Sequence, residues 1–145
     1  ELEGQLERYI DDHLFDCVNF SYYEDKGYSI KHGSISSKAT IFEDYVSLTM
    51  KLPVKAEKNH VVHNFEEYET ELGIRYGHVY DIASKITLEI AKRPEYRPLS
   101  FLLSFDVLPN VVPYNENVDV YVIRDPDSNK MGEEEYKFAF TAVFG

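Results

Sequence analysis

A helical spacing of apolar side chains in the middle of the chain limits its fold most strongly. Apolar residues recur there three and four positions apart, at Leu72, Tyr76, Val79, Ala83, Ile86 and Ile90. This spacing puts them on one face of an α-helix. Lys92 and Arg93 suit the negative end of the helix dipole, and Pro94 stops the helix. We therefore expect a helix at about 72–92. Gly77 costs about 1 kcal/mol inside it, which predicts a close approach of the helix to a sheet.

Alternation of apolar and polar residues predicts strands on both sides of this helix. The clearest run has apolar residues at every second position, at Val46, Leu48, Met50, Leu52 and Val54. This is the period of a half-buried strand. Pro53 has no amide proton to donate, so we expect the far end of this strand to lie at a sheet edge. Further strands are predicted at 28–31, 38–42, 59–69, 100–107, 118–123 and 136–144. The 100–107 run is almost wholly apolar, which predicts a central, covered strand.

A second helix is predicted at the start of the chain, from residue 1 to about 18. Its apolar stripe contains Leu2, Leu6, Tyr9, Ile10, His13, Leu14 and Cys17. The acidic residues Glu1, Glu3, Glu7, Asp11 and Asp12 occupy its other faces, where early acids suit the positive end of the helix. We expect a single domain, residues 1–145, of the α+β class. An antiparallel sheet of about five to seven strands packs against the two helices in this prediction.

The chain is acidic, with 26 Asp and Glu against 15 Lys and Arg and a formal net charge of −11. An acidic surface repels phosphate, so we expect no nucleic-acid partner. No apolar run reaches about 18 residues, so we expect no membrane insertion by this segment. The charge is typical of a solvated surface, and a surface for a basic partner is the alternative. Cys17 is the single cysteine, which excludes an internal disulfide.

The residues after the 118–123 strand resemble the first half of a calcium-binding loop. Asp125, Asp127 and Asn129 have the required spacing. The sixth and twelfth loop positions should be Gly and Glu, and they are Lys130 and Tyr136 here. The same residues are typical of a turn, and we expect this turn to join the last two strands as a hairpin. We assign no metal ligand and leave calcium binding by the three residues as the open alternative.

Other candidates for chemistry lack a required partner. His60 and His63 point to opposite sides of a strand, so they build no metal-binding face. His13 and Cys17 have helical i,i+4 spacing, but no orienting group or oxyanion hole accompanies them. A lone cysteine on an apolar helix face is typical of the core. We therefore predict no catalytic, cofactor-binding or metal-binding residues and no cofactor. Asn19 begins an N-glycosylation sequon, which matters if the domain is exported.

The run from Arg75 to Ile86 carries Arg, Gly, Tyr, Ile-Ala and Ile at fixed spacing. It resembles a segment of uncharacterised archaeal proteins with an N-terminal membrane anchor and an extracytoplasmic domain. Segments that follow the same proteins in order are 16–20, 27–30, 120–125 and 136–140. The stretch before Arg75 departs from them, because it is rich in Glu where Ser, Val and Pro are expected. The resemblance implies an extracytoplasmic location and no established activity, so no site residue is carried over.

Three functions fit these observations. The leading one is a non-enzymatic extracytoplasmic domain of a membrane-anchored protein, with a structural or protein-interaction role at the cell surface. Because the chain begins at Glu1 and not at Met, we expect an anchor or signal upstream of residue 1. The alternative is an acidic cytoplasmic inhibitor or immunity-type binding protein. The second alternative is a ligand-binding or enzymatic domain with a pocket between the second helix and the sheet. The oligomeric state is left open.

Overall fold

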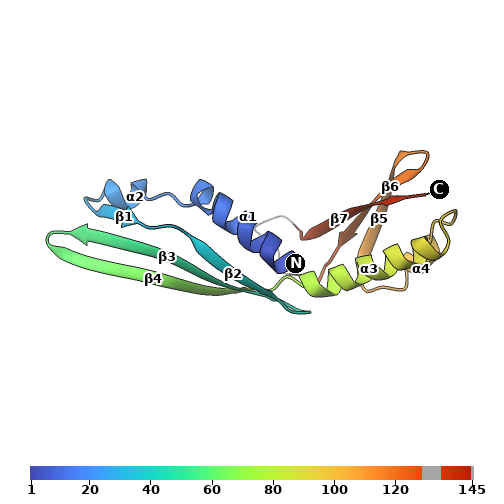
Figure 1. The fold of residues 1–145 in the computed structure, drawn as a ribbon, viewed down its shortest axis with the longest axis horizontal. Helices are drawn as coiled ribbons and strands as arrows, with labels where there is room; N and C mark the ends of the chain where they lie inside the picture. Colours follow the sequence, from blue (N-terminus) through green and yellow to red (C-terminus); the bar gives the residue numbers. More distant parts are fainter. Residues whose placement is uncertain (129–134, 145) are drawn as a thin grey trace. The chain divides into compact units, whose positions relative to one another are not determined.

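The computed structural model describes residues 1–128 and 135–144, and its helices and antiparallel sheets confirm the α+β class (Figure 1). The elements are α1 (Leu2–Cys17), α2 (Ser21–Glu24), β1 (Ser29–His32), β2 (Ser36–Ile41), β3 (Val46–Lys58), β4 (Val61–Leu72), α3 (Tyr76–Lys92), α4 (Leu99–Leu102), β5 (Leu108–Asn115), β6 (Val118–Arg124) and β7 (Lys137–Val143). The described strands form two sheets, of four and three strands, where the sequence predicted one.

Contacts within the chain divide it into two compact units. The first contains Glu1–Ile41 and Ser47–Glu71, and the second contains Phe42–Val46 and Leu72–Gly145. The four-stranded sheet belongs to the first unit apart from the ends of β3 and β4, and the three-stranded sheet belongs to the second. That the units behave as one domain stays a prediction.

In the first unit β3 is the central strand and pairs with β1, β2 and β4. Because a strand has only two edges, two of these three partner strands lie along the same edge of β3. β1 and β2 follow each other along one side of β3, and β4 lies along the other (Figure 1). β3 and β4 are joined by a two-residue turn in which Asn59 and His60 both have positive φ, 51° and 65°. This type I′ geometry suits the twist of a hairpin.

Pro53 lies inside this central strand, so the prediction that it marks a sheet edge is wrong. β3 continues past it to Lys58, and Val54 pairs with His32 at the end of β1. The carbonyl oxygen of Pro53 accepts a hydrogen bond from the Gly33 amide at 2.8 Å. Gly33 lies between β1 and β2 and belongs to neither strand. The residue opposite Pro53 is therefore not part of a strand that needs a hydrogen bond from its amide. The interruption of the neighbouring ladder therefore tolerates the missing amide proton.

α1 packs along β2 through its acidic side chains, and no residue of α1 is buried. Three carboxylates accept hydrogen bonds from backbone amides of β2: Glu3 from Ile41 at 2.9 Å, Glu7 from Ala39 at 3.0 Å and Asp11 from Ser37 at 2.8 Å. Four helical residues rise about 6.0 Å. Two strand residues advance about 6.6–6.8 Å, so the two repeats match. The helix thus closes the outer edge of β2, while its predicted apolar stripe stays incompletely covered.

The second unit is built from α3 and the β5-β6-β7 sheet, in which β6 pairs antiparallel with both neighbours. The apolar stripe of α3 is buried as predicted, at Val79, Ile82, Ala83, Ile86 and Ile90. The same core contains Tyr121 and Ile123 of β6, Ala142 of β7 and Phe144. Alternate residues of β6 are buried, from Asp119 to Ile123, and Asp125 continues this row. One row of β6 therefore combines apolar core residues with two aspartates.

The predicted helix is confirmed as α3, but its predicted start and the predicted 100–107 strand need correction. The helix begins at Tyr76 instead of about residue 72, because Leu72 is the last residue of β4. The 100–107 run is not a strand: it contains most of α4 and a turn, and Leu103 is 81% exposed. A short apolar run does not distinguish a strand from a helical turn. The strand that follows, β5, was not predicted; Pro109 and Pro113 lie within it, and such prolines are tolerated because β5 is an edge strand.

Gly77 lies in the first turn of α3, and the predicted close approach is present. A Cβ atom at this position would lie 2.5 Å from the carbonyl oxygen of Phe42 and 3.3 Å from the Cα atom of Glu43. The backbone that approaches is the turn between β2 and β3, not a strand of the sheet. Only glycine leaves room for it.

Candidate functional site

Charged side chains gather where α3 begins. The Arg75 guanidinium donates two hydrogen bonds to Asp125, from Nε to Oδ2 at 3.0 Å and from Nη2 to Oδ1 at 2.5 Å. The Asp125 side chain is fully buried. It also accepts hydrogen bonds from the Ser128 hydroxyl at 2.6 Å and from the Asp127 amide at 3.3 Å. Each Asp125 oxygen therefore accepts two hydrogen bonds, one of them from Arg75.

Asp106 extends this cluster toward the surface. It accepts a hydrogen bond from Arg75 Nη1 at 3.2 Å, and its Oδ1 lies 2.9 Å from Nε2 of His78. The other ring nitrogen of His78 lies 4.0 Å from a carboxylate oxygen of Glu43. The backbone amide of His78 donates to the Glu43 carbonyl oxygen at 3.4 Å. The imidazole thus lies between two carboxylates.

These contacts shift the pKa values of both aspartates downward. The hydrogen bond with His78 is the largest cause that lowers the pKa of Asp106, and Arg75 adds to it. Burial by itself would raise the pKa of Asp125, but the hydrogen bonds from Arg75 and Ser128 more than offset it. The pKa of Arg75 is raised, first by its hydrogen bond to Asp125. Arg75, Asp106 and Asp125 are therefore all charged above acidic pH.

A matching ion pair lies beyond the other end of α3. Arg97 Nε donates to Oδ2 of Asp119 at 2.6 Å, and the Asp119 side chain is almost fully buried. The Arg97 guanidinium also lies 4.9 Å from the centre of the Phe144 ring. Asp119 lies in the inward row of β6 and Asp125 follows that strand, so the two Arg–Asp pairs tie the segments before and after α3 to the same sheet. This is an arrangement that fixes an element in place.

The contacts of the His78–Asp106 pair in the described part of the chain are with charged side chains. Within residues 1–128 and 135–144, no Ser, Thr or Cys side chain hydrogen-bonds to His78. A histidine base needs such a nucleophile or a bound substrate within hydrogen-bond reach. The neighbouring Asp125 has no oxygen left for a ligand, because Arg75 and two further donors occupy it. We therefore interpret the cluster as structural.

Of the residues considered for calcium, the two that the structure describes, Asp125 and Asp127, both contact Arg75. Asp125 is committed to Arg75, and Asp127 is exposed and lies 3.2 Å from the same guanidinium. Asn129 lies outside the described residues, so the candidate loop is only partly visible. Among the residues with assigned positions, no group of three or more His, Cys, Asp or Glu side chains forms a metal site.

The remaining sequence candidates lie in the first unit. His60 is in the β3–β4 turn, and His63 is on the exposed β4. His13 Nδ1 lies 2.9 Å from the Tyr9 carbonyl oxygen, so it is held by its own helix. Cys17 is exposed, which contradicts its predicted place in the core. The Asn19 side chain accepts a hydrogen bond from the backbone amide of residue 21 at 2.9 Å.

An apolar groove of about 370 Å³ crosses the sheet of the first unit. It is lined by Val18, Phe20, Tyr23, Ile30, Met50, Leu52, Val54, Ala56, Phe65 and Tyr68. These side chains come from β1, β3, β4, α2 and the segment before it. The sequence suggested a pocket between α3 and the sheet, but that space holds the core of the second unit. Among the described residues, the two tyrosines are the only polar side chains that line the groove, so it suits an apolar group.

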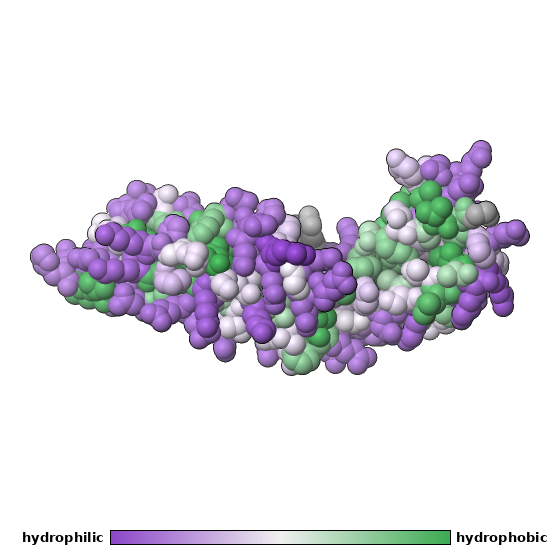
Figure 2. Space-filling view, viewed as in Figure 1, coloured by the Kyte–Doolittle hydropathy of each residue, from purple (hydrophilic) through white to green (hydrophobic). Residues whose placement is uncertain are grey.

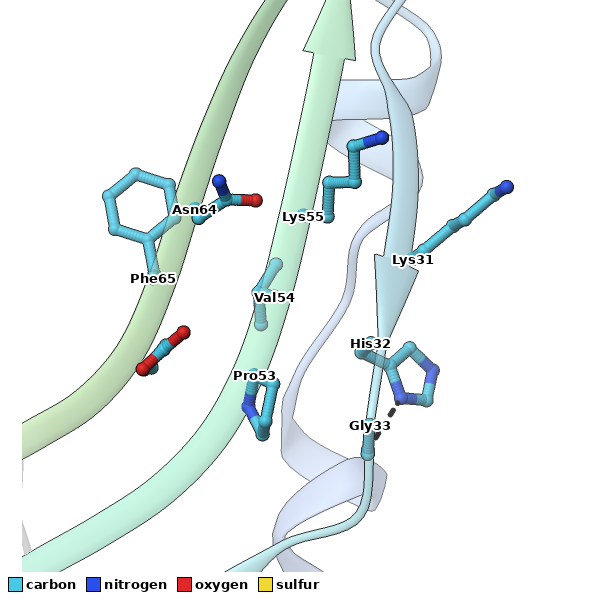
Figure 3. A pocket seen from close by; sticks show the side chains of 9 residues that line it. Lys31, His32, Gly33, Pro53, Val54, Lys55, Asn64 and Phe65 are labelled. Carbon is cyan, nitrogen blue, oxygen red and sulfur yellow. Dashed lines mark hydrogen bonds between the residues drawn. The ribbon is translucent and has the colours of Figure 1, made fainter.

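A second, smaller hollow of about 200 Å³ lies where β1, β3 and β4 run side by side (Figure 3). Lys31 and Lys55 are directly opposite each other across β1 and β3. Asn64 and Phe65 of β4 also line the hollow, and Asn64 lies on the β3 side of the strand (Figure 3). Lys55 is paired with Glu57 at 3.4 Å, and both side chains are about half exposed. Exposed lysine side chains do not by themselves make a ligand-binding site, so we assign no function to this hollow.

β4 is exposed along its length, and every residue from Val61 to Glu71 is solvent-accessible. Its large apolar side chains share this exposure: Val61, Val62, Phe65 and Tyr68. The second unit also presents apolar groups, which gather over β5–β7 and the end of α3 in Figure 2. Tyr114 and Val143, at the edges of that sheet, are 76% and 71% exposed. Both units thus offer uncovered sheet surface.

Comparisons with protein-family models, with curated proteins and with solved structures found no match to this chain. In the part of the chain that the structure describes, no helix has both the length and the apolar character needed to cross a membrane.

Proposed function

We propose that this chain is a non-enzymatic protein-interaction domain whose first unit binds an extended segment of a partner by strand addition to β4. One observation carries the proposal: among the described strands β4 pairs with β3 alone, and it is exposed from Val61 to Glu71. An open strand edge is a template for another strand, and main-chain hydrogen bonds supply the affinity in this type of recognition.

The two edges of the same sheet are treated differently. The β2 edge is closed by α1, whose carboxylates accept hydrogen bonds from three outward-facing amides. Natural sheets protect their edges in this way, since an open edge invites pairing with other chains. β4 is the longest exposed edge in the described part of this sheet and has no such cover there. This contrast between the two edges supports strand addition at β4.

The turn geometry indicates which amides a partner would meet. Residues that flank a two-residue hairpin turn form a hydrogen-bonded pair, so the amides of Val61 and His63 face β3. The amides of Val62 and Asn64 alternate with them and face away from β3. An added strand would pair with these two amides first.

The location belongs to the proposal and is supported by the resemblance alone. In it, the domain lies outside the cytoplasm and is tethered through a segment upstream of residue 1. Protease treatment of intact cells that express the full-length gene tests this part. A domain that stays protected until the cells are lysed would contradict it.

The binding proposal is tested by selecting peptides from a random 12-residue display library on the immobilised chain, a length that matches β4. We expect selected peptides to protect the amides of Val62 and Asn64 from hydrogen exchange. Asn64→Pro removes one outward amide without touching the β3 ladder, so it should weaken binding about tenfold or more. Asn64→Thr keeps the amide and is the matched control. Peptides that bind Asn64→Pro as tightly as the wild type would exclude β4 as the site.

A further inference from the structure

β4 carries a row of acidic side chains that form no ion pair with the described residues. From the middle of the strand to its end, the exposed glutamates are Glu66, Glu67, Glu69 and Glu71. None of the ion pairs formed among residues 1–128 and 135–144 involves these four side chains. Four like charges in six residues repel one another, and a neutral strand added beside them would leave this repulsion in place.

We propose that the segment bound by β4 is basic and carries an apolar anchor side chain that enters the groove of the first unit. This inference rests on the proposed function and identifies the chemistry of its partner. Lys or Arg opposite the glutamates gives favourable cross-strand pairs, and a net charge of −11 attracts a basic segment at long range.

The symmetric pairings of β4 with a second copy of this chain place like charges opposite each other. In an antiparallel pair of β4 strands about their common centre, Glu66 of one copy would lie opposite Glu67 of the other. A parallel pair in register would place all four glutamates beside their equivalents. Like charges directly opposite each other destabilise a sheet. The charge pattern therefore favours a different, basic chain.

The groove adjoins the proposed binding edge, because β4 itself forms one of its walls. Phe65 and Tyr68 of β4 line it together with Leu52 and Val54 of β3. A segment paired with β4 lies next to this wall and projects alternate side chains toward the same face of the sheet. A volume of about 370 Å³ accommodates an aromatic or aliphatic side chain. Pairing along the edge and an anchor in the groove are thus compatible in one segment.

The test uses the 12-residue peptides selected on the wild-type chain and measures their affinity at low and high salt. We expect peptides rich in Lys and Arg whose binding weakens as salt rises. A variant with Glu66, Glu67, Glu69 and Glu71 all changed to Gln should bind them about tenfold or more weakly. The matched control changes four exposed acids elsewhere to their amides: Glu1, Asp12, Asp16 and Glu24. The control has the same net charge and should lose much less affinity.

The anchor is tested by a double-variant comparison. Replacing the aromatic or large aliphatic residue of a selected peptide by Ala should weaken binding to the wild type about tenfold, and binding to Phe65→Ser by less. If the Ala substitution weakens binding to the wild type and to Phe65→Ser equally, the substituted peptide residue lies outside the groove. That result would overturn the proposed anchor.

The outcomes separate this inference from the proposed function. Peptides that require the Asn64 amide but are not basic, and that bind the four-Gln variant normally, would overturn the inference and leave strand addition standing. Peptides indifferent to Asn64→Pro, or no selected peptides at all, would overturn both.

Discussion

Replacing Arg75 by Met removes the partner of a buried charge while keeping an unbranched apolar stem. The Asp125 side chain is fully buried and accepts four hydrogen bonds, of which Arg75 supplies two. In Arg75→Met, the carboxylate keeps the hydrogen bonds from Ser128 and from the Asp127 amide. Breaking a buried ion pair from one side costs about 3–5 kcal/mol of stability. Loss of the exposed contact with Asp106 adds less than about 1 kcal/mol.

A double variant separates the lost pair from other effects of the substitution. Asp125→Asn removes the buried charge and keeps one oxygen acceptor. In Arg75→Met with Asp125→Asn, no unpaired charge is buried, so we expect the double variant to lose less than the sum of the two single losses. The difference should be about 1–3 kcal/mol, as for residues within one hydrogen-bonded network. Urea denaturation followed by circular dichroism at pH 7 measures all four proteins.

The pH dependence gives an independent check. The folded-state pKa of Asp125 is lowered, because the Arg75 and Ser128 hydrogen bonds outweigh the effect of burial. A lowered pKa contributes stability above the unfolded value, about 3.9, and that contribution is lost as pH falls through the folded pKa. In Arg75→Met, burial still raises the pKa of Asp125, but the arginine that lowered it is gone. Because acid protonates the unpaired carboxylate, the difference in free energy of unfolding between the variant and the wild type should become smaller at acidic pH.

Two results would refute this reasoning. One is a loss below about 1 kcal/mol for Arg75→Met at pH 7, since the buried carboxylate would then have found solvent or another partner. The other is a difference in free energy of unfolding between Arg75→Met and the wild type that stays constant from neutral to acidic pH.

Two further predictions concern backbone approach and edge protection. Gly77→Ala places a Cβ atom 2.5 Å from the Phe42 carbonyl oxygen, so it should destabilise the fold by about 1–3 kcal/mol despite the better helix propensity of alanine. An unchanged or higher melting temperature would contradict the close approach. Glu7→Ala leaves the buried Ala39 amide without its acceptor and should cost about 0.5–1.5 kcal/mol, while Glu7→Gln keeps an oxygen there and should cost less. Equal losses in the two Glu7 variants would show that the amide does not depend on this side chain.

Periodic segments were predictable because their signal is local. The α3 stripe, the first helix and the alternating strands appeared where the spacing placed them, and their ends shifted by a few residues. The 100–107 run failed because an apolar stretch without alternation fits a buried strand and a helical turn equally. β5 was missed since Pro109 and Pro113 argue against a strand, and only its position at a sheet edge makes them acceptable.

The contacts of the first helix show a signal that was present but was interpreted otherwise. Glu3, Glu7 and Asp11 are four residues apart and therefore share one helix face. Their early position in the helix also suits the helix dipole, which was the interpretation from sequence. Their real partners are amides of β2, and nothing in local sequence shows that a strand edge will lie beside that face. The open β4 edge was likewise not predictable, because its exposure depends on which strands pair.

β6 shows most clearly what the sequence determines by itself. Its alternation establishes a strand with two faces, one of valines at 118, 120 and 122 and one containing Asp119, Tyr121 and Ile123. Only the tertiary structure decides that the second face is the core. Burying an aspartate costs several kcal/mol unless it is paired, and Arg75 and Arg97 are the partners that make it possible at Asp125 and Asp119. Those arginines are 50 and 22 residues away in the chain, so no local pattern could assign the face.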